Sequence, residues 1–382
     1  MPKSKVALIR CESYGQHDVD SAITIGIDLL GGLDKFVQNG EKIILKPNLL
    51  SAQPPHKAVT THPNVFYAVA KHIRDEKSGL DLSWGDSSPK GTTKKILNTT
   101  GLKEKSDLLN LKFQDFEESI TISNPKGIVH KQFTISRAVH ECHGIINIAK
   151  LKTHHLTRIT AAVKNIFGCI PGLLKPEFHL KLPGVFEFCQ MIVELNLFIK
   201  PRLHIIDAIE AMEGNGPNAG TPKKLHCIIM SEDPVAADTV ACKLIGLKPE
   251  RVLTNLLGEK YNLGEMINFE IIGDGIESII DKNFEVQRGV NLSSNVAWKF
   301  RFLKNLISLK PIVNKNKCKK CQECIKHCPA IPIGLYWNNI KGLPEYDYSN
   351  CKRCYCCQEI CPAEAIEVKI PMIRKIMDRI FS

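Results

Sequence analysis

Nine of the 15 cysteines lie between residues 318 and 361, and eight of them form a duplicated pattern that constrains the fold more than any other feature. The first run, Cys318 to Pro329, and the second run, Cys351 to Pro362, both have the spacing C-x2-C-x2-C-x3-C-P. Three thiolates spaced in this way wrap one face of an iron-sulfur cubane, and the fourth cysteine, displaced by the following turn, reaches a second cluster. Structural zinc needs four ligands in two pairs and does not use the third cysteine or the proline. The repeat therefore predicts two [4Fe-4S] clusters.

This repeat resembles the bacterial two-cluster ferredoxins over roughly residues 315–369, with all eight ligand positions present. The resemblance implies a small α+β domain in which each cluster takes three cysteines from one run and the fourth from the other. The implied ligands are Cys318, Cys321, Cys324 and Cys361 for cluster 1, and Cys351, Cys354, Cys357 and Cys328 for cluster 2. Cys356 falls outside the spacing, and we interpret it as a small packed side chain near a cluster.

The region before the repeat has the pattern of an α/β protein. Short apolar runs alternate with stretches of helical period, and we interpret the runs as buried, mostly parallel strands. They include Lys42 to Leu45, Ile145 to Ile148, Leu203 to Ile206 and Cys227 to Met230. After the last run, Asp233 is expected to cap a helix that begins at Pro234 and that Gly246 ends.

The predicted fold class is α/β: a mostly parallel sheet with helices in a large N-terminal domain, plus a small C-terminal α+β ferredoxin-like domain with two clusters. A chain of 382 residues is long for one domain, and 43% hydrophobic and 24% charged residues are typical of globular proteins. We predict an α/β domain over 1–294, an amphipathic linker helix over 295–314, the ferredoxin domain over 315–369 and a C-terminal helix over 370–382.

The predicted helices over 295–314 and 370–382 contain basic amphipathic segments, for which two roles are considered. Each could lie on a membrane surface, but a helix that packs one domain on another needs the same pattern, and we favour that interpretation. No apolar run approaches the ~18 residues that span a bilayer, and the first ten residues lack a secretory signal. The expected location is the cytoplasm.

Polar side chains cluster at the carboxyl ends of the predicted strands, where ligands gather in open α/β sheets. Lys150, Lys152 and His154 sit two apart, so an extended backbone points all three to one face. Such a set suits a bound carboxylate or phosphate, and we assign the acid or base role to Lys152, His154 and Lys164. Residues assigned to substrate binding are Lys46, Asn48, His62, Asp86, Lys150, Asn165, Glu213 and Asn215. The alternative is a solvated, lysine-rich edge of the sheet.

Several other kinds of site are not favoured by the sequence. Neither the G-x-G-x-x-G nor the G-x-x-x-x-G-K-[ST] motif is present, so nothing supports a nucleotide site. The net charge of +11 attracts anions, but the aromatic-interleaved basic motifs of nucleic-acid modules are missing, and no nucleic-acid partner is expected. His140-Glu141-Cys142-His143 is not interpreted as a metal site, because alternate residues of a strand face opposite ways.

A second resemblance covers nearly the whole chain. Six motifs are similar to the series found in the domain of unknown function family 362: Lys46 to Leu49, Ala58 to Pro63, Gly85 to Ser87, Lys150 to His154, Val163 to Gly168 and Met212 to Pro217. Members of that family include uncharacterised Fe-S centre proteins, in which this domain precedes a two-cluster ferredoxin. The resemblance implies the architecture and a polar pocket, and no agreed reaction.

Two functions fit these observations. In the first, the chain is an oxidoreductase that passes electrons from a redox partner protein through the clusters to a small anionic substrate or cofactor in the α/β domain. In the second, it is a non-catalytic carrier or assembly module that docks on a partner redox enzyme. A turnover site needs the strand-end cations buried together, whereas a docking module would present them on an open face. Low-potential clusters fit a reducing cytoplasm and an anaerobic way of life.

Overall fold

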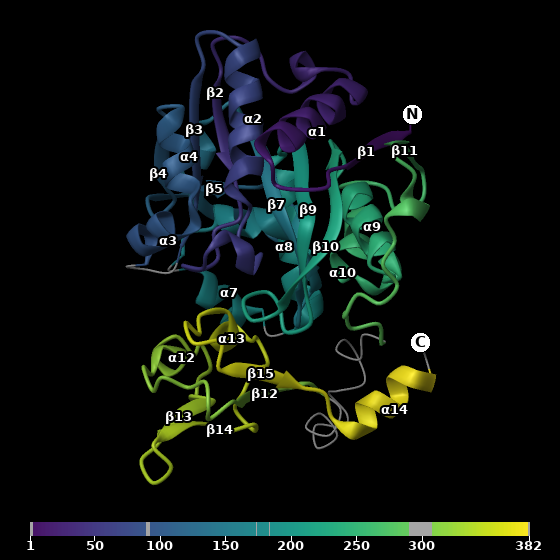
Figure 1. Cartoon of the computed structure of the whole chain (residues 1–382). Coiled ribbons are helices and arrows are strands. Elements are labelled where there is room, and N and C mark those ends of the chain that lie inside the picture. Colours follow the sequence, from purple (N-terminus) through teal and green to yellow (C-terminus); the bar gives the residue numbers. More distant parts are fainter. Residues whose placement is uncertain (1–2, 89–91, 173, 183, 290–307, 381–382) are drawn as a thin grey trace.

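A computed structural model of the chain describes residues 3–88, 92–172, 174–182, 184–289 and 308–380 (Figure 1). The larger part contains a nine-stranded sheet in the order β11-β1-β10-β9-β7-β2-β3-β4, with β8 paired to β7. Its strands are β1 (Ser4–Arg10), β2 (Lys42–Lys46), β3 (Asp81–Asp86), β4 (Lys112–Asp115), β7 (Gly144–His154), β8 (Arg158–Thr160), β9 (Leu203–Glu213), β10 (Thr221–Ser231) and β11 (Phe269–Gly273). A separate hairpin joins β5 (Ser119–Ser123) to β6 (Gln132–Ser136).

The predicted mostly parallel sheet is confirmed. The pairs β11/β1, β9/β7, β7/β2, β2/β3 and β3/β4 are parallel. Strand β10, which contains the predicted run Cys227 to Met230, runs antiparallel to both β1 and β9, and the short strand β8 runs antiparallel to β7. The carboxyl end of β10 therefore lies at the opposite edge of the sheet from the carboxyl ends of β7 and β9.

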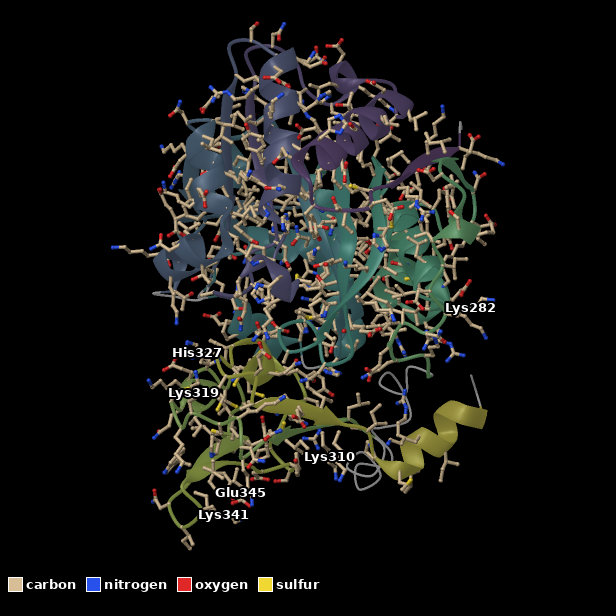
Figure 2. The ribbon with its side chains drawn as sticks, viewed as in Figure 1. Lys282, Lys310, Lys319, His327, Lys341 and Glu345 are labelled. Carbon is tan, nitrogen blue, oxygen red and sulfur yellow. The ribbon has the colours of Figure 1, made fainter. Side chains whose placement is uncertain are left out.

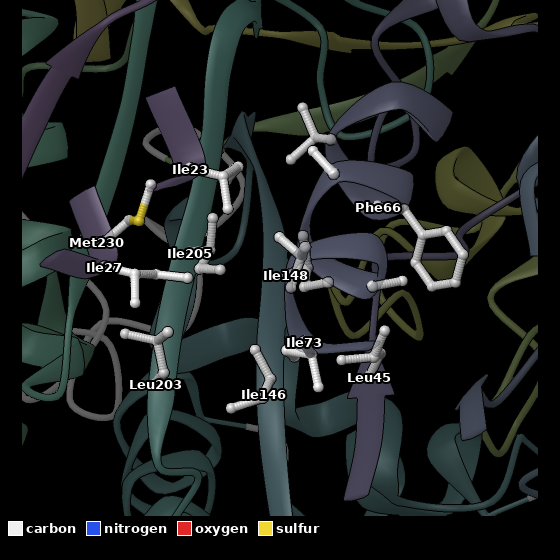
Figure 3. Close-up of a cluster of buried hydrophobic side chains, with 14 of the residues drawn as sticks. Ile23, Ile27, Leu45, Phe66, Ile73, Ile146, Ile148, Leu203, Ile205 and Met230 are labelled. Atoms are coloured by element: carbon white, nitrogen blue, oxygen red, sulfur yellow. The ribbon is translucent and has the colours of Figure 1, made fainter. Parts of the chain in front are cut away.

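Helices cover both faces of the sheet, as buried parallel strands require. On one face, Ile23 and Ile27 of α1 share a core with Phe66 of α2, Ile148 of β7 and Ile205 of β9 (Figure 3). Each such buried side chain contributes about 1.5–3 kcal/mol relative to an exposed one. The helices of this part are α1 (Gln16–Leu29), α2 (Pro63–Glu76), α3 (Thr93–Thr100), α4 (Leu102–Leu108), α5 (Arg137–Glu141), α6 (Ala162–Asn165), α7 (Lys175–Lys181), α8 (Val185–Ile199), α9 (Pro234–Leu244) and α10 (Leu253–Lys260).

Helix α9 begins and ends as predicted. The Asp233 carboxylate accepts hydrogen bonds from the backbone N–H groups of Val235 and Ala236, both at 2.9 Å, and Pro234 is the first helical residue. Gly246, just beyond the helix, adopts a φ of 62°. This left-handed conformation suits glycine, so the stop signal in the sequence acts as expected.

Strands β7 and β9 are longer than the sequence predicted. Lys150, Lys152 and His154 were expected to follow a strand, but all three lie within β7, and Asp207 lies within β9. The reason is tertiary pairing. Strand β8 folds back antiparallel onto the end of β7, with Lys152 opposite Thr160, and β10 pairs along most of β9.

The C-terminal part is a small strand-and-helix unit that contains both cysteine runs. Its strands form two antiparallel pairs, β12 (Lys310–Val313) with β15 (Ile366–Lys369) and β13 (Leu335–Asn338) with β14 (Leu343–Tyr346). Short helices α12 (Glu323–Lys326) and α13 (Cys356–Glu359) lie inside the runs, and α14 (Met372–Ile380) follows. Within the described residues, no helix is long and apolar enough to cross a membrane.

Of the predicted linker helix, only the last residues, 308–314, are among the described residues. Residues 295–307 lie outside the described residues. Lys310–Val313, at the end of the predicted range, forms strand β12 and is not helical, because it pairs with β15. Helix α14 occupies the range in which the C-terminal helix was predicted.

Candidate functional site at the junction of the sheet and the cysteine runs

The two cysteine runs repeat the same unusual backbone conformation. Lys320 and Gln322 in the first run, and Arg353 and Tyr355 in the second, have φ values between 58° and 62°. Equivalent positions of the two runs are therefore left-handed, which costs free energy for residues other than glycine. Successive turns of this kind aim backbone N–H groups into a concavity that favours anions, as in many Fe-S sites.

One cavity brings together cysteines from both runs. Its lining contains Cys318, Cys321 and Cys324 from the first run and Cys361 from the second. The neighbouring wall is largely apolar and includes Val313, Pro344, Ala363, Ala365 and Ile366. Four thiols around one largely apolar cavity fit a cubane held by three cysteines of one run and the last cysteine of the other.

The second run also has the features of a cluster-binding loop. Cys357 is buried, and the Tyr346 hydroxyl lies 3.1 Å from its Sγ, where it can donate to a thiolate. Gly334 packs so closely on this run that a Cβ there would lie 2.7 Å from the Cα of Cys351. Cys356, the residue outside the spacing, hydrogen-bonds to Cys354 through its side chain.

The second run contacts the sheet through His154 and Glu359. His154 Nδ1 accepts from the backbone N–H groups of Leu156 and Thr157 at 3.1 Å and 3.3 Å, so the ring proton is on Nε2. That Nε2 lies 3.0 Å from Oε1 of Glu359 in α13. Burial lowers the pKa of His154 to about 3, so the ring is neutral at physiological pH. His154 is thus a neutral ring whose Nε2 lies close to a carboxylate without meeting the geometry of a hydrogen bond.

Hydrogen bonds from the loop between β9 and β10 complete this junction, at the end of the sheet where Figure 1 shows α13. Gln358 donates to the backbone oxygens of Asn215 and Gly216 at 2.7 Å and 3.1 Å. Asn218 donates to the backbone oxygen of Cys361 at 3.2 Å, and the Asn215 amide donates to that of Ile366 at 3.2 Å. Asn215, predicted to bind substrate, therefore ties the two parts of the chain together.

Three lysines lie within electrostatic reach of Glu359, whose carboxylate is next to His154, and we call Lys152, His154, Lys164 and Lys175 the basic cluster. Lys152 is buried, and its ammonium donates to Asn48 Oδ1 at 2.7 Å and to the Val59 oxygen at 2.6 Å. Burial lowers the pKa of all three lysines, that of Lys175 to about 8, and the nearby charge of Glu359 acts in the opposite direction. The basic cluster is therefore a group of buried and half-buried basic side chains close to Glu359, and the Asp86 carboxylate also acts on Lys152 and Lys175.

A buried ion pair forms the wall beside the basic cluster. Lys46 Nζ lies 3.0 Å from Asp86, whose oxygens also accept from the backbone N–H groups of Leu49 and Ser87 at 2.8 Å and 2.9 Å. Gly168 packs directly on this pair. Lys46 and Asp86 were predicted to bind substrate, and in the structure they form an ion pair with each other.

A second buried network lies along β7 and β9. Lys150 Nζ donates to Asp207 at 3.0 Å and to the Tyr14 hydroxyl at 2.6 Å. His62 caps α2, because its Nδ1 accepts from the backbone N–H of Asn64 at 3.2 Å, and its ring stacks on Tyr14 at 3.5 Å. The contacts of Lys150 and His62 therefore lie within this second network and do not involve Glu359.

The remaining predicted residues have structural contacts. Asn165 donates to Asn147 Oδ1 at 2.7 Å, which fixes α6 beside β7. Glu213 accepts from the backbone N–H of Glu285 at 2.8 Å. Within the described residues, no group of three His, Cys, Asp or Glu side chains is arranged to hold a single metal ion. His140 and Glu141 lie in helix α5, not in the strand that the sequence analysis assumed.

Comparison with known proteins identifies the larger part. A family model described as Domain of unknown function (DUF362) matches residues 43–243. The chain belongs to this family. In this DUF362 member a second model, the 4Fe-4S dicluster domain, matches residues 310–362, which contain all eight cysteines of the two runs.

One relative and two solved structures are similar to this DUF362 protein. A thylakoid-associated protein of Synechocystis sp. is 30% identical over 259 residues, which are 68% of this chain and 79% of that protein. The lactate racemase apoprotein of Thermoanaerobacterium thermosaccharolyticum aligns with a TM-score of 0.40 and 11% identity over 64% of this chain and 57% of its own. A Thermotoga maritima protein from structural genomics gives 0.36 and 12% over 62% and 60%. The chain spans less than two thirds of either solved chain.

The sequence of this DUF362 protein identified the basic side of the site but missed its acidic partner. Lys152, His154 and Lys164 were predicted and converge near Glu359, which was not predicted. A signal for Glu359 existed in the repeat, because the equivalent position of the first run is Lys326, so the charge is reversed between the two runs. Lys175 was missed as well, since it lies in a helical stretch with no motif.

Proposed function

We propose that this DUF362 protein is an electron-transfer protein in which the two cysteine runs hold two [4Fe-4S] clusters and deliver electrons to a small anion bound at the basic cluster. The ligand sets are those implied by the ferredoxin pattern, with Cys361 completing cluster 1 and Cys328 completing cluster 2. The dicluster family match and the shared cavity of four cysteines support this assignment. When bound, such clusters supply one-electron redox chemistry at low potential.

One observation carries the proposal: the second cysteine run is packed directly on the basic cluster. Glu359, two residues after Cys357 and two before Cys361, lies 3.0 Å from His154. An anion held by Lys152 and Lys164 would therefore be bound beside the second run. Fusing the carrier to the binding site raises its effective concentration there, which is useful when electrons are consumed on the spot.

The residues of the basic cluster have the chemistry to hold a carboxylate or phosphate. Lys152 supplies a buried ammonium donor and Lys164 a half-buried one, and charge-assisted hydrogen bonds to an anion are strong. Neutral His154 offers its Nε2–H to an anionic oxygen without adding charge. Glu359 now fills the position of that anion, so we expect a substrate anion to compete with this carboxylate. Lys46, Asp86 and Asn165 shape the wall.

The opposite side of the C-terminal part suits an electron donor. Cys321 is exposed, and exposed Lys317, Lys319 and Lys320 surround it in the sequence. Figure 2 shows Lys341 at the end of this part that lies away from the sheet and Lys319 on its flank. We infer that an acidic redox carrier docks here and that cluster 1 receives its electrons, because opposite surface charges steer association.

A second candidate function is a docking or assembly module in which the basic cluster only holds the ferredoxin part in place. The favouring observation is that Glu359 already occupies the basic cluster, supported by Gln358 on the loop at Asn215. For either function we propose a cytoplasmic, oxygen-poor setting without nucleic acid or membrane contact. The thylakoid association of the Synechocystis relative marks a membrane surface as the alternative setting.

Calorimetric titration under anaerobic conditions separates the two functions. The full chain is titrated with inorganic phosphate and a panel of small carboxylates. We expect at least one to bind, with Lys164→Ala weakening it by about 1.5–3 kcal/mol, or roughly tenfold to more than a hundredfold. Glu359→Gln should strengthen binding, because it removes the competing charge. The matched control Lys103→Ala removes an exposed lysine of α4 and should change nothing.

The docking function is supported instead when no anion in the panel binds wild type or Glu359→Gln at millimolar concentration while both retain full iron content. Any anion that binds is then tested as an electron acceptor from the chemically reduced protein. Binding without electron transfer would contradict the oxidoreductase proposal.

A further inference from the structure

One side of the cluster 1 cavity is formed by a short stretch of the second run, residues 361–366, which we call the Cys361 segment. Cys361, Ala365 and Ile366 are buried and line the cavity together with the three cysteines of the first run. Cys361 Sγ accepts a hydrogen bond from the backbone N–H of Ala365 at 3.3 Å. Hydrogen bonds to the sulfurs tune an iron-sulfur cluster. The conformation of this segment therefore sets both the position and the hydrogen bonding of the Cys361 thiol.

The loop between β9 and β10 contacts both ends of the Cys361 segment. The Asn218 amide donates to the backbone oxygen of Cys361, and the Asn215 amide donates to that of Ile366, both at 3.2 Å. The Cys361 oxygen also accepts from the backbone N–H of Glu364 at 3.3 Å, so Asn218 supports the carbonyl that closes this turn. Asn218 is 2% exposed, and water cannot readily replace its donor.

The same loop is tied to the sheet, so its hold on the Cys361 segment is a firm one. Thr153 Oγ1, in β7, accepts from the backbone N–H of Gly216 at 3.2 Å. The Ser51 hydroxyl donates to Asn218 Oδ1 at 2.5 Å. Because Ser51 engages the oxygen of the Asn218 side chain, the NH2 group of that side chain is the part that faces Cys361.

The ligands implied for cluster 2 have their close contacts inside the C-terminal part. The Tyr346 hydroxyl lies 3.1 Å from Cys357 Sγ, and Gly334 packs on Cys351. Among the residues that the structure describes, no cysteine of the two runs other than Cys361 exchanges a hydrogen bond with the α/β part. The contact between that part and the cluster ligands therefore favours cluster 1.

We propose that Asn218 is a positioning residue for Cys361, so that the α/β part completes the binding site of cluster 1 and leaves that of cluster 2 to the C-terminal part. The inference rests on the two-cluster assignment of the proposed function. It adds that the sheet acts on the ferredoxin part through cluster 1. Without the Asn218 donor, the turn at Cys361 is held less firmly, and the thiol that it carries is a weaker ligand.

The first test measures the release of iron to a chelator from the anaerobically purified full chain. Asn218→Leu has about the size of the wild-type side chain and no donor. We expect about half of the iron, the share of cluster 1, to leave about fivefold faster, which corresponds to about 1 kcal/mol for one lost hydrogen bond. The other half should leave at the wild-type rate. Asn283→Leu changes an exposed asparagine and is the matched control.

A reduction potential separates positioning from a general loss of stability. Asn218→Asp keeps the acceptor for Ser51 but replaces the donor by a carboxylate oxygen beside the Cys361 carbonyl. Negative charge near a cluster disfavours its reduction, so at alkaline pH, where this carboxyl is ionised, the midpoint of cluster 1 should fall. We expect about a tenfold change in the reduction equilibrium, which is 59 mV for one electron. Cluster 2 should not move.

The midpoints are measured by potentiometric titration with electron paramagnetic resonance, and the signal of cluster 1 is assigned with Cys321→Ser. The proposal is overturned if both clusters release iron faster by the same factor, if both midpoints shift together, or if both Asn218 variants with full iron content match wild type. Should the Asn218 variants fail to fold, Ser51→Ala removes the bond that orients Asn218. It should give smaller changes confined to cluster 1, and their absence would overturn the proposal in the same way.

Failure of the proposed function gives different results. A wild-type protein with far fewer than about eight iron per chain would contradict the two-cluster assignment itself. An absence of anion binding would contradict the proposed substrate site and would leave the role of Asn218 intact.

Discussion

Replacing Gly168 by alanine should separate the buried ion pair beside the basic cluster. A Cβ at this position would overlap Asp86 Oδ1 and lie 2.5 Å from Lys46 Nζ. Real Cβ atoms do not approach other heavy atoms so closely, so one partner has to move. The closer of the two contacts is with Asp86 Oδ1, so moving the lysine alone would not relieve it. We therefore expect the Asp86 carboxylate to shift away from Lys46 and from the N–H groups of Leu49 and Ser87.

The size of the effect follows from the burial of the pair. The side chains of Lys46 and Asp86 are 0% and 4% exposed, so little water can replace either partner when the pair separates. Breaking a buried pair while leaving a charge behind costs about 3 to 5 kcal/mol. At about 2 °C for each kcal/mol in a domain of this size, the melting temperature should fall by roughly 6 to 10 °C.

Thermal melts followed by circular dichroism on the anaerobic, iron-loaded chain provide the measurement. Gly275→Ala is the matched control, since a Cβ there would meet only Glu277 Oε2, at 3.5 Å, and the change should stay within about 0.5 kcal/mol. A Gly168→Ala protein that melts within ~2 °C of wild type would have lost no more than about 1 kcal/mol, and this result would refute the reasoning.

Three further predictions concern the cysteines, the pH dependence and the division into domains. The anaerobically purified protein should contain about eight iron and eight sulfide per chain, with Cys356→Ser unchanged and Cys357→Ser losing or converting one cluster; equal iron loss in both variants would show that the ligand assignment is wrong. Burial raises the pKa of Asp238 to about 7, so the native state keeps a proton that the unfolded state has lost. Stability should therefore fall by about 1.4 kcal/mol per pH unit between roughly pH 5 and 6 and level off above about pH 7, and urea unfolding of Asp238→Asn should lack this slope. Residues 1–309 should fold without the cysteine runs, because the three large cores contain only residues before 290; an aggregated or molten product by near-ultraviolet circular dichroism would count against this.

Sequence reasoning succeeded where local patterns decide the structure. The apolar runs became strands, the signals at Asp233 and Gly246 bounded α9, and the cysteine spacing led to the dicluster match. It failed at the lengths of β7 and β9. Lysines are common in loops, but pairing of β7 with β9 and β8 keeps the backbone at Lys150 and Lys152 extended.

The candidate site was half predictable for a similar reason. Alternation along β7 placed Lys152 and His154 on one side of the strand, and this needs no tertiary information. The contact between His154 and Glu359 joins positions about two hundred residues apart in the sequence, so no local pattern indicates it. Pairing within the sheet likewise turned Lys46 and Lys150 from expected ligand contacts into partners of Asp86 and Asp207.

The reversed charge between the two runs decides which way the C-terminal unit can sit on the sheet. The runs share their spacing and their left-handed positions, so in backbone terms either could face the sheet. Rotating the unit to present the first run would place Lys326, the equivalent of Glu359, among Lys152 and Lys164. Like charges brought together without water repel strongly, so the rotated arrangement is rejected. The two runs of this duplicated unit therefore differ in charge at one equivalent position, and the run that carries Glu359 is the one that faces the sheet.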